Sequence, residues 1–230
     1  MTRPDWWLDE QIHAGAEHLD PAYVAGYDAK SQVDPTSDVE ALVALGMGEG
    51  STVVDLGAGT GVFTMAAAET GARVIAADVA APMVAALMQR TAGMPNVTVV
   101  QAGFLTFEHD GPPVDIVHTR NALHQIPDFW KVVALQRIHD VLTPGGILRL
   151  RDLVFELEPA AIADGIEAWK AGAVDDPARG YTAPEFAEHV RAEHSTFTWL
   201  LEPALERVGF EILDRQVGRN VYAAYTCRRA

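Results

Sequence analysis

Cysteine and basic residues are scarce in this sequence. Its 230 residues include a single cysteine, Cys227, which excludes an intrachain disulfide and a cluster of cysteine metal ligands. The 17 lysines and arginines are outnumbered by 32 aspartates and glutamates, which gives a formal net charge of −15 at pH 7. Because such a surface repels phosphate groups, neither nucleic acid nor an anionic membrane is expected as a partner.

Long apolar runs are also missing. No uninterrupted apolar stretch approaches the roughly 20 residues that cross a bilayer, so membrane insertion is not expected. The first ten residues, MTRPDWWLDE, are acidic and aromatic, whereas a secretory signal needs a basic segment followed by an apolar one. Together with the near absence of cysteine, these features predict a cytoplasmic protein.

Short apolar runs do occur, and they alternate with helix-like stretches. This alternation is typical of β-α-β units that form a mostly parallel sheet, so the sequence predicts an α/β fold. The expected strands are 52–56, 73–78, 97–100, 114–117 and 147–150, and the expected helices between them are 64–70, 82–92 and 129–142. The segment 143–146 (TPGG) is expected to end the last of these helices, because proline cannot continue it.

The pattern changes after residue 155. Residues 156–196 contain no strand-like run, which predicts an inserted helical cap, and Thr182 with Glu185 forms a capping-box pattern that begins a helix there. A helix over 199–208 ends at Gly209, and strands follow at 210–213 and 221–226. Because the link at 218–220 is too short for a helical crossover, these two strands are expected to be antiparallel.

A glycine-rich turn follows the first strand. Gly57, Gly59 and Gly61 fall within five residues, where bare backbone and a helix N-terminus are available to a ligand. Asp78 ends the second strand, where a carboxylate can accept ribose hydroxyls, although it also suits a helix N-cap. A dinucleotide fingerprint would need glycine or alanine at position 62, where this sequence has Val62.

These segments together resemble the class I S-adenosylmethionine-dependent methyltransferases. The resemblance covers about residues 20–155 and is greatest to the small-molecule branch of ubiquinone and menaquinone biosynthesis methyltransferases. It implies a Rossmann-like seven-stranded sheet in the order 3-2-1-4-5-7-6, with the last strand antiparallel and helices on both faces. The matching motifs are DLGAGTG at 55–61, Asp78 with Met83, NALHQIP at 121–127 and LTPGG at 142–146.

The resemblance also implies a division of residues 1–230, taken as a single methyltransferase domain. Residues 1–50 would form N-terminal helices that cover the site, and residues 51–155 the cofactor-binding core. Residues 156–197 would form the cap, and residues 198–230 the final helix and antiparallel strand pair. The implied cofactor is S-adenosyl-L-methionine, and the implied partner is a small-molecule methyl acceptor. A homodimer is compatible with the sequence.

Site residues can be assigned only through the same resemblance. Gly57, Ala58 and Gly59 would cradle the methionine part of the cofactor, with Asp55 near its ammonium group, Asp78 on the ribose and Met83 along the adenine. The remaining expected contacts are Tyr27, Val79, Gly103, Phe104 and Asn121. The family often has an acid after the third strand, beside the adenine amino group, but this sequence has QAGF at 101–104. The adenine edge is therefore left to backbone groups.

His124 is the candidate catalytic residue. It follows the fourth strand at the carboxyl edge of the sheet, where it is placed to accept a proton from a hydroxyl nucleophile, although a purely structural histidine fits the same position. No metal is expected, because His13 and His18, like His189 and His194, are five residues apart rather than four. The alternative functions are a cofactor-binding sensor or subunit without catalysis and a nicotinamide-dependent oxidoreductase.

Overall fold

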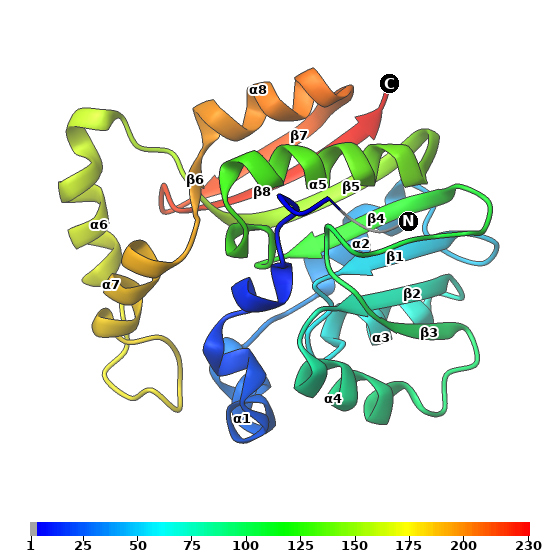
Figure 1. Ribbon diagram of the computed structural model, residues 1–230, viewed down its shortest axis with the longest axis horizontal. Helices are drawn as coiled ribbons and strands as arrows, with labels where there is room; N and C mark the ends of the chain where they lie inside the picture. Colours follow the sequence, from blue (N-terminus) through cyan, green and yellow to red (C-terminus); the bar gives the residue numbers. More distant parts are fainter. Residues whose placement is uncertain (1–3) are drawn as a thin grey trace.

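The computed structural model describes residues 4–230 and shows one central sheet with helices on both faces (Figure 1). The sheet has eight strands in the order β3-β2-β1-β4-β5-β8-β7, with β6 paired to β5 off this path. This is the expected order, with the last two strands renumbered because the two-residue β6 precedes them. A strand that short carries no periodic signal, so the sequence predicted seven strands rather than eight. The strands are β1 (Thr52–Leu56), β2 (Arg73–Asp78), β3 (Val97–Gln101), β4 (Val114–Arg120), β5 (Leu142–Phe155), β6 (Thr196–Phe197), β7 (Phe210–Gly218) and β8 (Tyr222–Arg229).

Strands β1 to β5 are parallel, whereas β8 runs antiparallel to both β5 and β7. The central strand β1 is covered on both faces, and its consecutive residues Val53 and Val54 are both completely buried. A strand covered on both faces is apolar without alternation, which is why β1 appears in the sequence as a continuous run. The antiparallel pairing of the final two strands confirms the prediction made from their short link.

Two helical layers enclose the sheet. Leu42 of α2 and Phe63 of α3 pack with Val53 in one apolar cluster, and Leu135 of α5 and Leu205 of α8 pack with Val54 in another. The two clusters lie on opposite faces because neighbouring strand residues point in opposite directions. The helices of these layers are α2 (Thr36–Ala44), α3 (Val62–Glu69), α5 (Asp128–Val141) and α8 (Thr198–Val208), and α4 (Ala81–Thr91) packs against β2 and β3.

The remaining helices lie beyond the carboxyl ends of the parallel strands (Figure 1). The cap has its own apolar cluster, in which the rings of Trp169 and Phe186 stack with centroids 4.2 Å apart. These helices therefore surround the edge of the sheet where ligands bind in open α/β folds. They are η1 (Glu10–His13), η2 (Ala16–Leu19), α1 (Pro21–Ser31), η3 (Leu123–Gln125), η4 (Pro159–Ala161), α6 (Ile162–Lys170) and α7 (Ala183–Ala192).

The helix starts and ends predicted from local sequence patterns agree with the structure in part. Both hydrogen bonds of the capping box at Thr182 and Glu185 are present, and Gly209 ends α8 with φ +107°. The helix that 143–146 was expected to end does end there, at Val141, but β5 begins directly at Leu142 and passes through these residues. Gly145 adopts φ +78° within the strand, and the pairing register with β4 shifts there, so the chain bulges instead of leaving the sheet.

A buried charged network anchors α2 to the sheet. Asp38 is completely buried, and its carboxylate accepts hydrogen bonds from Arg149 at 2.9 Å and from Arg120 at 3.2 Å. The Nε2 atom of His118 lies 3.9 Å from the same carboxylate, too far for a hydrogen bond but close enough for a charge interaction. Burial by itself would raise the pKa of Asp38, but His118, Arg151 and Arg149 outweigh burial and hold this pKa well below its usual range.

None of the helices within residues 4–230 has the length and apolar character needed to cross a membrane.

Candidate active site

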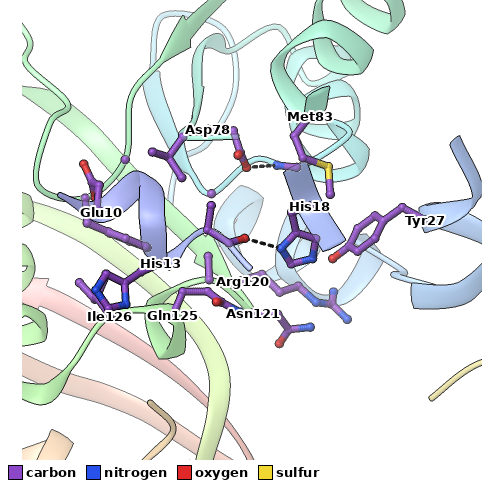
Figure 2. Close-up of a pocket in the computed structure, with 17 residues that line it drawn as sticks. Glu10, His13, His18, Tyr27, Asp78, Met83, Arg120, Asn121, Gln125 and Ile126 are labelled. Atoms are coloured by element: carbon purple, nitrogen blue, oxygen red, sulfur yellow. Dashed lines mark hydrogen bonds between the residues drawn. The ribbon is translucent and has the colours of Figure 1, made fainter. Parts of the chain in front are cut away.

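Two adjoining cavities open at the carboxyl ends of the parallel strands. The first, with a volume of about 80 Å³, is bounded by the loops after β1, β2, β3 and β4 and by the N-terminal helices. Figure 2 shows Glu10 and Tyr27 on opposite sides of it. The strand order reverses between β1 and β4, so their loops diverge there and leave the crevice typical of this fold.

The glycine-rich turn forms one wall of the first cavity. Gly57 and Gly59 have φ values of +72° and +55°, which favour glycine. A Cβ atom added at Gly57 would lie 2.3 Å from the Cβ of Ala122, whereas one added at Gly59 would meet no atom within 4 Å. Gly57 is therefore required by packing inside the protein, and Gly59 keeps the cavity wall free of a side chain.

Asp78 is tied to this turn. One of its carboxylate oxygens accepts a hydrogen bond from the Gly59 amide and the other from the Ala80 amide, both at 2.9 Å. Burial raises the pKa of Asp78, and the two amide hydrogen bonds offset part of that rise. Each oxygen keeps accepting capacity, so the carboxylate fits the two hydroxyls of a ribose.

The structure gathers most of the predicted cofactor residues around the first cavity. Asp55 and Ala58 are not among the residues that line it. Ala58 donates its amide to Ala77 at 3.0 Å, in the turn behind the wall. The predicted residues that do line the cavity are Tyr27, Gly57, Gly59, Asp78, Val79, Met83, Gly103, Phe104 and Asn121.

Asp55 lies inside the protein instead. It is 2% exposed, and its carboxylate accepts the Thr64 hydroxyl at 2.6 Å and lies 2.8 Å from Nδ1 of His118. The ring of Phe63 stacks on His118 with centroids 3.5 Å apart. Both oxygens of Asp55 are therefore engaged by side chains that hold α3 and β4 against β1.

Glu10 supplies an acid that the sequence analysis did not anticipate. It is 4% exposed and lies against Gly103, where its carboxylate accepts the Leu105 amide at 2.9 Å and the Thr106 hydroxyl. This is the start of the loop after β3, where residues 101–104 (QAGF) include no acid. The contact joins residues 95 positions apart, and no local pattern in the sequence signals it.

Other residues of the first cavity were also missed. Arg120 at the end of β4 is the one lysine or arginine on this wall among residues 4–230, so it is the available partner for a carboxylate. His18 is fixed by a hydrogen bond between its Nδ1 and the Ala14 carbonyl at 2.7 Å, and its ring packs against Tyr27. The lining residues that were not predicted are Glu10, His13, Ala14, His18, Arg120, Ala122, Gln125 and Ile126.

The second cavity is larger, about 560 Å³, and shares part of its wall with the first. Six aromatic side chains from the N-terminal helices, the cap and β8 line it, together with four glutamates. Within the described part of the chain, no lysine or arginine is among its lining residues. The aromatic residues are Tyr23, Tyr27, Trp169, Tyr181, Phe186 and Tyr222, and the glutamates are Glu17, Glu185, Glu188 and Glu193.

His124 lies in the wall of the second cavity, between two carboxylates. Its Nδ1 pairs with Asp152, which also accepts the His124 amide at 3.0 Å, and its Nε2 lies 2.9 Å from Oε2 of Glu193. Burial by itself would lower the pKa of the ring, but Asp152 and Glu193 outweigh it and raise this pKa to about 9. The side-chain amide of Gln125 lies 3.0 Å from both His124 Nε2 and Glu193.

His189 completes a cluster around the same carboxylate. Its Nδ1 lies 2.8 Å from Oε2 of Glu193, and its Nε2 lies 2.7 Å from the Ser195 hydroxyl. His189 and Glu193 are four residues apart, a spacing that a comparison of histidine pairs alone does not include. His194, which was expected on the same helix as His189, lies beyond the end of α7, and His13 and His18 lie on separate 3-10 helices.

The groups that line the first cavity match those of an adenosyl ligand, but the cavity is small. The open wall at Gly59 allows the ligand to contact the backbone. The carboxylate of Asp78 matches the ribose, and the cation of Arg120 matches the carboxylate of the methionine part. Its volume of about 80 Å³ is below the roughly 300–1,000 Å³ of typical ligand pockets. Residues of η1, η2 and α1 line this cavity, so the N-terminal segment limits the space for a ligand.

Known proteins are similar to this chain. Residues 53–146 match the family described as "Methyltransferase domain". An uncharacterized methyltransferase of Geobacillus kaustophilus is 28% identical over 167 residues, covering 66% of this chain and 76% of that protein. The cypemycin N-terminal methyltransferase of a Streptomyces species is 35% identical over 99 residues, covering 43% of this chain and 40% of that protein.

A solved structure extends the similarity to nearly the whole chain. Magnesium protoporphyrin IX methyltransferase from Synechocystis, solved with bound S-adenosylmethionine, aligns with a TM-score of 0.66 at 16% identity and covers 99% of this chain and 100% of that one. The fold, the glycine-rich turn with Asp78, the domain match and the relatives agree. Together they support a class I S-adenosylmethionine-dependent methyltransferase with S-adenosyl-L-methionine as its cofactor.

Proposed function

We propose that this enzyme methylates a small organic molecule held in the second cavity. The observation that carries the proposal is the wall shared by the two cavities, formed by His13, His18, Tyr27, Asn121 and Gln125. A cofactor in the first cavity and an acceptor in the second would meet at this wall. The membership of the ubiquinone-like and menaquinone-like branch, the cytoplasmic location and a homodimer stay predictions.

Each part of the cofactor has a matching group in the first cavity. Asp78 would accept the ribose hydroxyls, Glu10 and the backbone at Gly103 and Phe104 would face the adenine edge, and Met83 would pack on its ring. Arg120 would pair with the carboxylate of the methionine part, near Asn121. The cofactor supplies a methyl carbon activated by its positive sulfonium, so the protein has chiefly to align the nucleophile behind that carbon.

The second cavity favours a neutral or cationic acceptor. Four glutamates line it, whereas no lysine or arginine of the described residues does, so its lining repels an anionic acceptor more than a neutral or cationic one. Its aromatic walls suit a planar or apolar body and attract a cationic amine through their ring faces. The similar cypemycin N-terminal methyltransferase is named for an N-terminal acceptor, which agrees with a nitrogen nucleophile, and the similar magnesium protoporphyrin IX methyltransferase is named for a planar acceptor.

The experiment that tests the function measures binding and turnover separately. Calorimetry with S-adenosylmethionine and with a nicotinamide dinucleotide is expected to give heat only for the former. Incubation with labelled cofactor and fractionated small amines and phenols is expected to give a labelled product. Binding without any labelled product from a broad acceptor panel would favour the alternative of a non-catalytic sensor, and binding of the dinucleotide alone would overturn the assignment.

Asp78→Asn is expected to weaken cofactor binding by about 1–3 kcal/mol, which is roughly tenfold to more than a hundredfold. The amide has one acceptor oxygen, so it cannot serve the Gly59 amide, the Ala80 amide and two hydroxyls together. A comparison with the 2′-deoxy form of S-adenosylhomocysteine isolates the ribose contact. The wild type should discriminate against the deoxy ligand more strongly than the variant does. Equal discrimination by both proteins would contradict the proposed role.

His124→Ala is expected to reduce turnover by about a hundredfold, the lower end of what acid-base catalysis contributes. We propose that His124 acts close to the reacting group of the acceptor, because it lines the second cavity. Cofactor affinity should not change, since His124 does not line the first cavity. His109→Ala removes a histidine that lies away from both cavities and serves as the control. A fall in cofactor affinity equal to the fall in turnover would contradict the role.

A further inference from the structure

We propose that His124, His189 and Glu193 bind a divalent transition-metal ion, with Zn²⁺ as the best match to the ligand set. The site would lie in the wall of the second cavity. Binding of the ion does not depend on the proposed function, whereas its effect on an acceptor rests on that function. Methyl transfer from a sulfonium needs no metal, so the chemistry of the cofactor does not by itself imply a metal ion here.

The three side chains converge on one point. Nε2 of His124 and Nδ1 of His189 lie 2.9 and 2.8 Å from the same oxygen of Glu193, and the three donor atoms lie within 4.8 Å of one another. Two histidines and one glutamate form a known protein ligand set of catalytic zinc, which leaves a fourth position open. Tetrahedral bonds of about 2.0–2.2 Å place donors about 3.3–3.6 Å apart, so shifts of roughly half an ångström or more would bring the three donors to bonding distance of one ion.

The far side of each imidazole is already held. Nδ1 of His124 pairs with Asp152, whose carboxylate also accepts the Leu153 amide at 2.7 Å, and Nε2 of His189 pairs with the Ser195 hydroxyl. A carboxylate or hydroxyl on the outer nitrogen is the usual support of a metal-binding histidine, because it fixes the ring and its tautomer. With hydrogens on the outer nitrogens, both inner lone pairs face the Glu193 carboxylate. Protons on the inner nitrogens or the nearby Gln125 amide can satisfy these groups, and a divalent ion can bind in place of those protons.

The cavity favours a cation at this point. Glu17 and Glu188 also line it, and no lysine or arginine from residues 4–230 is among its lining residues. Lys30 lies nearby, but its ammonium pairs with Glu185 and packs over the rings of Tyr23 and Tyr181. A dication bound to His124, His189 and Glu193 would therefore meet a negative surrounding.

A metal ion bound at this cluster would have two effects, one on the cap and one on the acceptor. His124 comes from the loop after β4, whereas His189 and Glu193 come from the end of α7, so a shared ion would tie the cap to the sheet edge. The open fourth position would face the acceptor cavity. An acceptor hydroxyl or amine bound there would become more acidic, because a dication lowers the pKa of a coordinated group.

The test uses the untagged full-length chain after treatment with a chelator and dialysis. Titration with Zn²⁺ by calorimetry is expected to show one equivalent per chain, and titration with Co²⁺ is expected to give the visible ligand-field bands of tetrahedral coordination. His189→Ala and the nearly isosteric Glu193→Gln are each expected to weaken Zn²⁺ binding about a hundredfold or more. Loss of a group that only supports a metal ligand costs about 10–100-fold, so the expected effect is larger. His13→Ala removes a histidine of the same cavity that is outside the cluster, and Zn²⁺ affinity should be unchanged.

Failure of this site is distinguishable from failure of the methyltransferase function. Absence of a bound equivalent in a chain that still binds S-adenosylmethionine would overturn the metal site alone. Undiminished Zn²⁺ affinity in folded Glu193→Gln would also overturn it, because the ion would then be bound elsewhere. Thermal unfolding followed by circular dichroism identifies any variant that has lost its fold, and Glu193→Gln keeps the test decisive if His189→Ala does not fold.

Discussion

Gly59→Asn is expected to reduce the affinity for S-adenosylmethionine about a thousandfold while the fold is retained. A side chain at this position extends from the cavity wall into open space, because its Cβ meets no protein atom within 4 Å. Overfilling a site costs about 1–3 kcal/mol, and the lost contact between backbone and a charged ligand costs about as much again. The sum is close to the 4 kcal/mol that corresponds to a thousandfold change in Kd.

Asparagine is chosen because it tolerates a positive φ better than other side chains. Gly145→Asn is the matched control: Gly145 also has a positive φ, +78°, and open space at its Cβ, but it does not line either cavity. Calorimetry and thermal unfolding of both variants separate loss of the ligand from loss of the fold. A Gly59→Asn chain that binds the cofactor as tightly as Gly145→Asn would place the cofactor somewhere else.

Gly57 is a less informative target, although the sequence analysis assigned it the same role. Its added Cβ would lie 2.3 Å from the Cβ of Ala122, so a substitution there disturbs the loop after β4 even without a ligand. Loss of cofactor binding in such a variant would not distinguish a blocked cavity from a displaced loop. The difference between the two glycines depends on a neighbour 65 residues away, which only the folded chain supplies.

Asp38→Asn is expected to lower the free energy of unfolding by about 3–5 kcal/mol, the usual effect of removing one member of a buried ion pair. Arg149 is 3% exposed and would be left without its charged partner. The carboxylate also faces Arg120, Arg151 and His118, so the loss of its charge affects four groups. Urea unfolding followed by circular dichroism measures the change, with the exposed Asp140→Asn as a control that should lie within about 0.5 kcal/mol of the wild type.

The same substitution predicts a difference in acid sensitivity. Because the pKa of Asp38 is lower in the folded chain than in the unfolded chain, its ionised form stabilises the fold above the usual carboxyl range near pH 4. That contribution is lost as the pH falls through this range and below it. The wild type should therefore lose more stability than Asp38→Asn between about pH 5 and pH 3. Parallel pH profiles for the two proteins, or an unfolding difference under 1 kcal/mol, would contradict the role of this network.

The sequence by itself predicted the alternation of strands and helices, and its resemblance to a known family supplied the strand order and the cofactor. These predictions depend on signals between near neighbours: apolar runs, a capping box, and short motifs such as three glycines and an aspartate at the ends of two consecutive strands. Such signals extend over a few residues, so they can be recognised in the sequence without knowledge of the fold. Asp78 and Gly59 were placed on one cavity because parallel strands bring their carboxyl ends to the same edge.

Only the tertiary structure decided which distant side chains meet. Asp55 resembles a ligand residue in its motif, yet Thr64 and His118 engage both of its oxygens inside the protein. Glu10 reaches the loop after β3 from 95 residues away, and His124 meets Glu193 across 69 positions. Contacts of this kind arise from the packing of whole elements, which leaves no periodic pattern along the chain. For that reason the cofactor core could be predicted from the sequence, whereas the acceptor cavity and its His-Glu cluster could not.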